Sequence, residues 1–172
     1  MTFVKNETLK TGYYIQPSFQ INLGKNDLAL LEKKKIKSYF KKVGTITKSG
    51  SNSFMYRVRS LNDLNNIILP HFTEFPLKTQ KQADFKLFTL IVDLINKKEH
   101  LTFEGIRKIT SIKASMNKGL TETIKADFPD AIPVLRDNVE PKDLNPQFLS
   151  GFIEPLLLLR AKGWRKFLDW YY

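Results

Sequence analysis

The feature that most constrains this chain is a run of alternating apolar and polar residues at positions 12–23. Side chains two residues apart lie on the same face of a β-strand, so this alternation predicts a strand buried on one face only. One face carries Tyr13, Ile15, Phe19, Ile21 and Leu23, and the other carries Tyr14, Gln16, Ser18, Gln20 and Asn22. The polar face holds no charge. Pro17 lacks a backbone N–H, which favours a sheet edge or a bulge at that point.

A second hairpin is predicted further along the chain. Residues 43–48 have the pattern of a strand, 49–52 that of a turn and 53–59 that of the partner strand. On the partner strand two basic residues face away from three large apolar ones: Arg57 and Arg59 against Phe54, Tyr56 and Val58. Residues 1–9 supply a strand before 12–23. The two hairpins together predict a four-stranded antiparallel sheet.

Helices are predicted around these strands. One starts at 26 or 27, and capping signals mark three later starts: Ser60 with Asp63, Thr79 with Gln82, and Thr102. The helix after Thr79 carries an apolar stripe of Phe85, Phe88, Ile91, Val92 and Ile95. The element order ββαββααα predicts an α+β fold with helices covering one face of the sheet.

Proline content divides the chain. Residues 127–146 contain four prolines, at 129, 133, 141 and 146, and are expected to form a linker. Residues 1–126 form the main domain in this interpretation, and 147–172 are an apolar segment interrupted by Pro155 and Gly163.

The charge favours polyanionic partners. Lys and Arg number 28 against 17 Asp and Glu, which leaves a formal +11. Lys and Arg on phosphates release condensed counterions, although a Lys-rich solvated surface has the same composition. The absence of cysteine excludes disulfides, thiolate nucleophiles and Cys-based zinc sites. No apolar run approaches the roughly 20 residues that span a bilayer, so no membrane partner is expected.

The polar sheet face is the candidate nucleic-acid surface. A β-ribbon fits the DNA major groove, where Gln and Asn can pair with adenine edges and Arg with guanine. The candidate contacts are Gln16, Ser18, Gln20, Asn22, Lys48, Arg57 and Arg59. The alternative is an ordinary solvated sheet face.

Several segments resemble the LAGLIDADG homing endonucleases of fungal organelle introns. They include PLKTQKQADF at 76–85 and IKASMNKGL at 112–120, with shorter matches at 17–21, 27–33, 43–44, 56–58, 67–72 and 100–105. The resemblance implies a saddle-shaped half-domain that binds double-stranded DNA, and cleavage by Mg²⁺ held between two motif helices. It also implies a mitochondrial location. Some relatives act as maturases on their own intron RNA.

The sequence departs from the family pattern at the motif helices. The chain begins near the first strand, so the first motif helix is expected to be missing. A second motif starts at 145–154, but Pro155, Leu156 and Leu157 stand where the family has a small residue, the metal-binding acid and glycine. We therefore expect a truncated half-domain that binds no metal and has impaired catalysis.

The resemblance also suggests two catalytic candidates. Lys81 matches a region where relatives place a basic residue near the scissile phosphate, with Lys78 a weaker candidate; the alternative is a solvated lysine in the first helical turn. Glu154 occupies an upstream acidic position that is not the family's principal ligand.

Three functional interpretations follow. The leading one is a catalytically impaired DNA-binding protein of this family, and the second is a maturase-like protein that binds intron RNA. The third is a folded product without a role. Association of copies through exposed helix surface is also expected.

Overall fold

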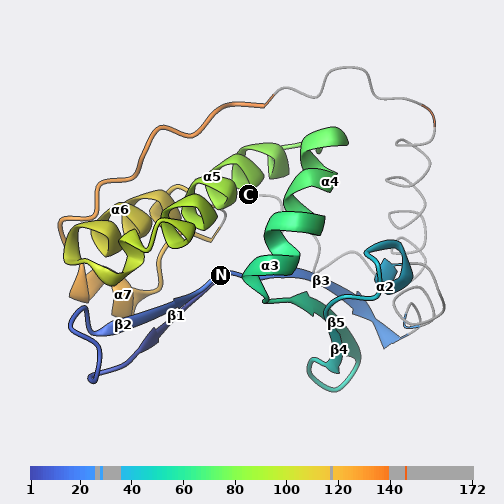
Figure 1. The fold of residues 1–172 in the computed structure, drawn as a ribbon, viewed down its shortest axis with the longest axis horizontal. Coiled ribbons are helices and arrows are strands. Elements are labelled where there is room, and N and C mark those ends of the chain that lie inside the picture. Colours follow the sequence, from blue (N-terminus) through green and yellow to red (C-terminus); the bar gives the residue numbers. More distant parts are fainter. Residues whose placement is uncertain (26–27, 29–35, 117, 140–145, 147–172) are drawn as a thin grey trace, which may run out of the picture.

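A computed structural model describes residues 1–25, 28, 36–116, 118–139 and 146 (Figure 1). The described strands form two antiparallel sheets. In the first, β1 (Thr2–Lys5) pairs with β2 (Tyr13–Gln16). In the second, β5 (Ser53–Val58) lies between β3 (Phe19–Gly24) and β4 (Thr45–Lys48).

The α+β architecture of antiparallel strands backed by helices is confirmed, but the single four-stranded sheet is corrected to two sheets. The predicted strand at 12–23 is divided at Pro17 and Ser18, both buried. Pro17 cannot donate a ladder hydrogen bond, so the pairing ends there. The predicted alternation continues across the break, with Tyr13 and Ile15 buried and Gln20 and Asn22 exposed.

The described helices include parts of each predicted one, and two short helices at 69–74 and 122–127 were not predicted. The described helices are α2 (Ile36–Tyr39), α3 (Leu61–Asp63), the π-helical turn η2 (Leu64–Ile68), α4 (Leu69–Glu74), α5 (Lys81–Asn96), the 3₁₀ turn η3 (Glu99–Leu101), α6 (Phe103–Ala114) and α7 (Glu122–Asp127). Two predicted caps are confirmed: the Ser60 hydroxyl accepts from the Asp63 N–H, and the Thr102 hydroxyl accepts from the Gly105 N–H. The predicted start at 26 or 27 lies outside the described residues.

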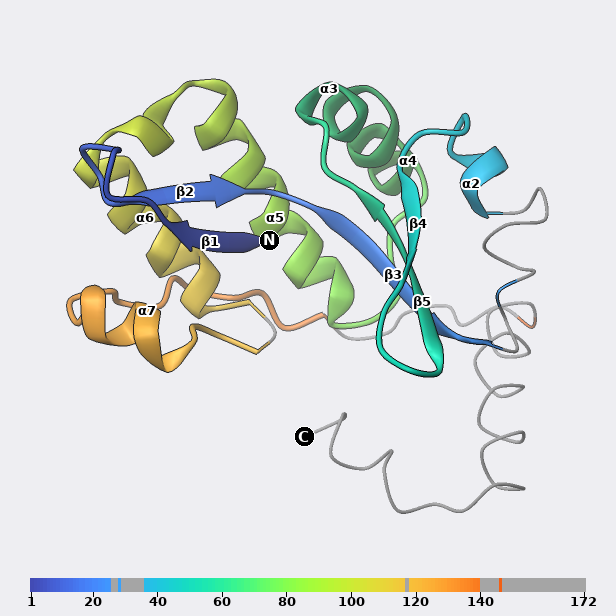
Figure 2. The same cartoon turned by 90° about the horizontal axis from the view of Figure 1, so that it is seen from below.

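Helix α5 packs against both sheets through two sets of side chains. Leu87, Ile91 and Ile95 join a hydrophobic cluster with Tyr13 and Ile15 of β2. On its other side, Phe88 and Val92 join a cluster with Tyr56 and Val58 of β5. Figure 2, seen from below, places the strands in front of α5 and α6. The helices therefore cover one side of both sheets, and the other side of the strands faces outward.

The described part of the predicted linker lies along the helices. Residues 129–139, here called the strap, run beside α6 and α5 (Figure 1). The Ser115 hydroxyl donates to the Val134 carbonyl at 2.6 Å, and Lys86 pairs with Asp137 at 2.7 Å. Side-chain contacts thus hold this proline-containing segment to the domain. The boundaries of the linker stay a prediction.

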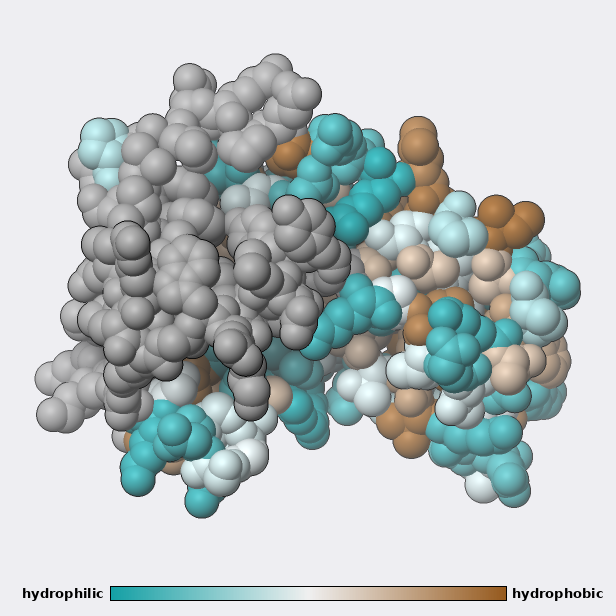
Figure 3. All heavy atoms as spheres, turned by 180° about the vertical axis from the view of Figure 1, so that it is seen from behind, coloured by the Kyte–Doolittle hydropathy of each residue, from teal (hydrophilic) through white to brown (hydrophobic). Residues whose placement is uncertain are grey.

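Apolar side chains are exposed on the strap and on the helices. Ile132 and Leu135 are 77% and 93% exposed, and Leu90 of α5 is half exposed. In the space-filling view from behind, brown apolar residues alternate with teal and white ones outside the grey area (Figure 3). Association of copies through this surface stays a prediction. Among the described residues, none of the helices has the length and apolarity to cross a bilayer.

Two buried tyrosines predict a loss of stability in alkali. Burial raises the pKa of Tyr56 to about 12, and its hydroxyl donates to the Val43 carbonyl. A hydrogen bond to the Asp127 carboxylate, together with burial, raises the pKa of Tyr13 to about 12. In the unfolded chain both groups titrate near 10. The folded state holds these protons more tightly than the unfolded chain does. Their contribution to the free energy of unfolding is therefore fully present below about pH 10 and is lost between about pH 10 and 12.

We therefore expect the free energy of unfolding to fall over that interval, with Tyr56 contributing about 2–3 kcal/mol of the loss. Urea unfolding at pH 8 to 12 measures it. The Tyr56→Phe variant, which cannot ionise at this position, should lose less stability than the wild type over the same range. Equal losses in the two proteins would contradict the assignment to Tyr56.

Candidate nucleic-acid interface

The outward face of the three-stranded sheet carries two rows of polar side chains. Strand pairing places Gln20 opposite Arg57 and Asn22 opposite Met55. On the other side of β5, Thr45 lies opposite Arg57, and Thr47 lies opposite Met55. The rows are thus Gln20–Arg57–Thr45 and Asn22–Met55–Thr47. Their β3 and β4 members are exposed and their β5 members are half-buried. Neighbouring side chains on one sheet face are close enough to contact one ligand together.

Arg57 is the charged residue in these rows. Its Nη2 lies 2.8 Å from the Met55 sulfur, and its Nε has no hydrogen-bond partner among the described residues. Burial lowers the pKa of the Met1 α-amino group, and the charges of Lys113 and Arg57 lower it further. Arg57 of β5 and Lys113 of α6 therefore both lie close enough to Met1 for their charges to act on its amino group.

Three other predicted contacts, Gln16, Ser18 and Arg59, occupy different settings. Gln16 is half-buried opposite Thr2 in the two-stranded sheet, and Arg59 is exposed just after β5. Ser18 is only 9% exposed, and its hydroxyl accepts from the Gln20 side-chain amide at 2.8 Å. Ser18 therefore orients Gln20 and presents little surface of its own. Gln20, Asn22 and Arg57 are the predicted residues that the structure brings together.

Lys48 does not share the outward face. It is paired with Phe54, which also pairs with Leu23, so Lys48 lies in an apolar row on the helix-facing side. A four-residue turn at 49–52 would have paired Lys48 with Ser53. Instead, Ser49 is paired with Ser53 through its backbone N–H, which shortens the loop by one residue. A shift of one residue moves a side chain to the opposite face.

Sequence reasoning missed three members of the rows: Thr45, Thr47 and Met55. Alternation alone places these residues on the same face as Arg57 once the hairpin register is known. The register of β4 against β5 could not be predicted, because it depends on the exact length of the loop that joins the two strands.

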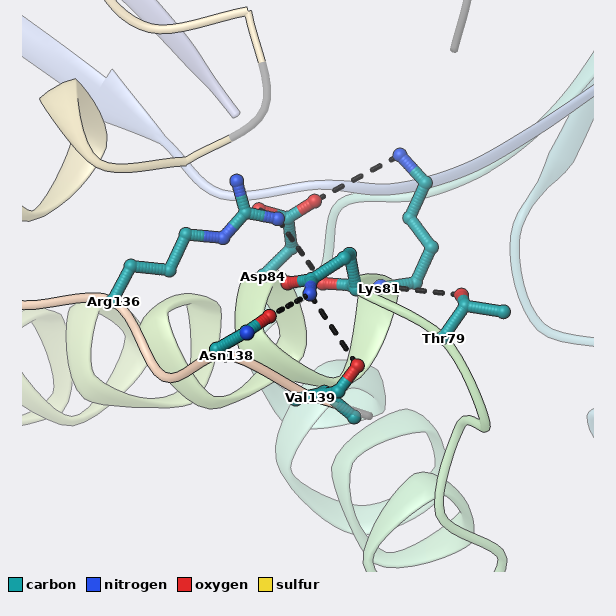
Figure 4. A network of polar contacts seen from close by, with 7 residues as sticks. Thr79, Lys81, Asp84, Arg136, Asn138 and Val139 are labelled. Carbon is teal, nitrogen blue, oxygen red and sulfur yellow. Dashed lines mark hydrogen bonds and ion pairs between the residues drawn. The ribbon is translucent and has the colours of Figure 1, made fainter. Parts of the chain in front are cut away.

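The second part of the site lies at the start of α5. Lys81 is the first residue of the helix, and its ammonium lies 3.8 Å from one oxygen of Asp84. Arg136 of the strap lies 3.2 Å from the other oxygen. In Figure 4 the Lys81 and Arg136 cationic groups lie on either side of the Asp84 carboxylate. Lys78 is exposed just before the helix, and Glu154 lies outside the described residues.

Lys113 of α6 interacts electrostatically with Asp84 and with the Met1 amino group next to the sheet. Burial lowers its pKa, whereas the negative charge of Asp84 opposes that effect. Its ammonium donates to the Gly119 carbonyl at 2.7 Å. The charge of Lys113 therefore acts on the Met1 amino group, and the charge of Asp84 acts on Lys113.

The described residues of this region do not fit a divalent metal. Among residues 1–25, 28, 36–116, 118–139 and 146, no three His, Asp or Glu side chains converge to form a metal site. Both oxygens of Asp84 face cations, which would repel a metal ion. The resemblance implies Mg²⁺ in the family, and the described residues of this region offer no set of ligands for it. This arrangement suits the binding of a polyanion instead.

Comparison with known proteins finds related sequences. A family model described as LAGLIDADG endonuclease matches residues 1–92. Probable intron-encoded endonuclease 2 of Neurospora crassa is 41% identical over 141 residues, covering 81% of this chain and 31% of the relative. Probable intron-encoded endonuclease 3 of the same fungus is 40% identical over 152 residues, which cover 87% of this chain and 28% of the relative.

Solved structures show the same similarity. The meganuclease I-SmaMI bound to uncleaveable DNA superposes with a TM-score of 0.83 at 41% identity, covering 88% of this chain and 50% of that one. The meganuclease I-CpaMI bound to uncleaved DNA superposes with a TM-score of 0.79 at 38% identity. The match covers 88% of this chain and 51% of the I-CpaMI chain. A further I-SmaMI structure was obtained on an uncleaved DNA target in the presence of calcium ions. The chain thus spans about a third of the length of these curated relatives and half of these solved structures.

Proposed function

The chain belongs to the LAGLIDADG endonuclease family, and from that premise we propose that it binds double-stranded DNA through the outward face of its sheets. The observation that carries the proposal is the row Gln20–Arg57–Thr45, in which an arginine lies between two uncharged polar side chains on an exposed sheet surface. Arg pairs with guanine and Gln with adenine in the major groove.

Two lysines outside the sheet would bind the DNA backbone. Lys81 and Lys113 come from α5 and α6, and Lys81 shares the Asp84 carboxylate with Arg136 of the strap. Phosphate contacts fix the position of a protein on DNA without reading sequence, whereas base contacts supply specificity. In the proposal, the sheet rows read bases, and Lys81 and Lys113 neutralise phosphates. The DNA complexes of I-SmaMI and I-CpaMI support a duplex partner.

We further propose that the 172-residue chain binds DNA without cleaving it. Leu156 stands where the family resemblance implies a metal-binding acid, and the Asp84 oxygens face cations. The curated relatives are fungal intron-encoded proteins, and a mitochondrial location is part of the proposal. The alternative is binding of intron RNA in the manner of a maturase.

The salt dependence of binding tests this proposal. Neutralising about six phosphates would weaken the affinity for duplex DNA by about 10³-fold between 50 and 200 mM KCl. Fluorescence anisotropy with a labelled duplex, with an RNA hairpin of equal length and with heparin measures it. We expect the duplex to bind at least about tenfold more tightly than the hairpin at matched salt.

Each contrary result has a distinct meaning. Tighter binding to RNA would favour the maturase alternative. Equal affinities for the duplex, the hairpin and heparin would mean that the chain binds any polyanion through its net charge alone. Incubation with supercoiled plasmid and Mg²⁺ should leave the plasmid intact. Nicking that stops on addition of EDTA would overturn the absence of cleavage.

A further inference from the structure

Among the described residues, two cations from different parts of the chain reach the Asp84 carboxylate. Its side chain is 14% exposed, with one oxygen 3.2 Å from Arg136 Nη2 and the other 3.8 Å from Lys81 Nζ. Figure 4 shows the strap carrying Arg136 to the first turn of α5, where both partners meet Asp84. The closer cation is the one contributed by the strap.

The guanidinium of Arg136 is held in place by more than Asp84. Its Nη2 also donates to the Gln80 carbonyl at 3.2 Å. The Gln80 side-chain amide donates in turn to the Asn138 side chain at 2.6 Å and to the Val139 carbonyl at 3.3 Å. These contacts surround the residue that precedes α5. A planar guanidinium fixed at two acceptors is a well-oriented partner for a carboxylate.

The sharing has an electrostatic consequence for Lys81. A carboxylate next to a lysine attracts its ammonium and repels any phosphate that approaches the same lysine. Arg136 carries a full positive charge close to Asp84, and it offsets both effects. The Lys81 side chain is 45% exposed beside this pair.

We propose that Arg136 is a positioning residue for Lys81: by neutralising Asp84, it lets the Lys81 ammonium bind a DNA phosphate. The inference rests on the proposed DNA-binding function and adds to it a role for the strap. Arg136 acts through Asp84 and makes no phosphate contact itself. Without Arg136, Asp84 would hold the lysine and repel the phosphate.

The test is a set of variants of the 172-residue chain, titrated by anisotropy with a labelled 30-base-pair duplex across a series of KCl concentrations. The slope of log Kd against log [KCl] reports the number of phosphates neutralised, at about 0.9 per contact. Lys81→Ala should reduce the slope by about one contact. Arg136→Gln should reduce it by the same amount, and the double variant should lose no more than either single variant.

A second substitution separates positioning from structural damage. In the Arg136→Gln background, Asp84→Asn removes the charge that would hold Lys81, so the slope should return to the wild-type value. Asp137→Asn breaks another strap contact, the pair with Lys86 at 2.7 Å, and should leave the slope unchanged. Unfolding midpoints of all variants are measured in parallel, and a merely structural role for Arg136 predicts no rescue by Asp84→Asn.

The outcomes are distinguishable. If the wild type binds the duplex without a salt-dependent affinity, the proposed function itself fails. If the wild type binds and Lys81→Ala loses a contact while Arg136→Gln does not, the positioning role is overturned. Additive losses in the Lys81→Ala, Arg136→Gln double variant would also overturn it, because they would mean that Arg136 contacts phosphate directly.

Discussion

Replacing Gly105 with alanine is expected to destabilise the domain by at least about 4 kcal/mol, a large part of the stability of a domain of this size. Gly105 lies in the first turn of α6, buried against the 3₁₀ turn η3. A Cβ atom at this position would lie 1.9 Å from the Glu99 carbonyl oxygen and 2.4 Å from its carbon. Because these are backbone atoms, no rotamer change relieves the collision, and α6 must move away from η3.

Urea unfolding of Gly105→Ala measures the effect, and Gly12→Ala is the matched control. Gly12 has a φ of +71° and no atom within 4 Å of the position of an added Cβ. Its substitution should cost only about 1–2 kcal/mol, from backbone conformation alone. At Gly105 the backbone is helical, so alanine brings no such strain. A Gly105→Ala protein as stable as the wild type would contradict the described packing of α6 on η3.

Replacing Arg57 with glutamate is expected to raise the Kd for duplex DNA at least about 100-fold. Loss of an arginine contact to a base accounts for about 1–3 kcal/mol, and a carboxylate at the same place adds repulsion from the phosphates. Arg57 lies in the middle strand of its sheet, between Gln20 and Thr45, and the other row, Asn22–Met55–Thr47, holds no basic residue. Anisotropy at a fixed KCl concentration provides the measurement.

Lys97→Glu controls for the change in net charge. Lys97 is exposed at the end of α5, and its substitution changes the charge by the same two units. We expect its effect on the Kd to stay within about threefold, because an exposed charge more than about a Debye length from the DNA is largely screened. Equal losses for Arg57→Glu and Lys97→Glu would show that only the total charge matters. The thermal unfolding midpoint of Arg57→Glu checks that the sheet remains folded.

Local patterns in the sequence predicted much of the fold. The alternation around Tyr13 and Gln20 gave the buried and exposed faces of β2 and β3, and the caps at Ser60 and Thr102 marked helix starts. These signals depend on residues within a few positions of one another. They carry no information on where a strand pairing stops, which is why the division at Pro17 into two sheets was not predicted.

The candidate site was less predictable because it depends on distant residues. The side of the sheet on which Lys48 lies follows from the loop length, and one residue of difference moves it away from Arg57. The contact between Asp84 and Arg136 joins a helix to a segment whose prolines gave it the pattern of a free linker. Neither residue has a local signal for the other. The tertiary path of the strap brings them together.

None of the side chains in the two cross-strand rows belongs to either hydrophobic cluster. Gln20, Asn22, Thr45 and Thr47 can therefore be exchanged for other polar residues while the interior stays the same. A lineage of such proteins could acquire a new target preference in single mutational steps, with no compensating change in α5 or its neighbours. Retargeting would then be limited by the supply of suitable DNA sites, and the stability of the domain would set no barrier to it.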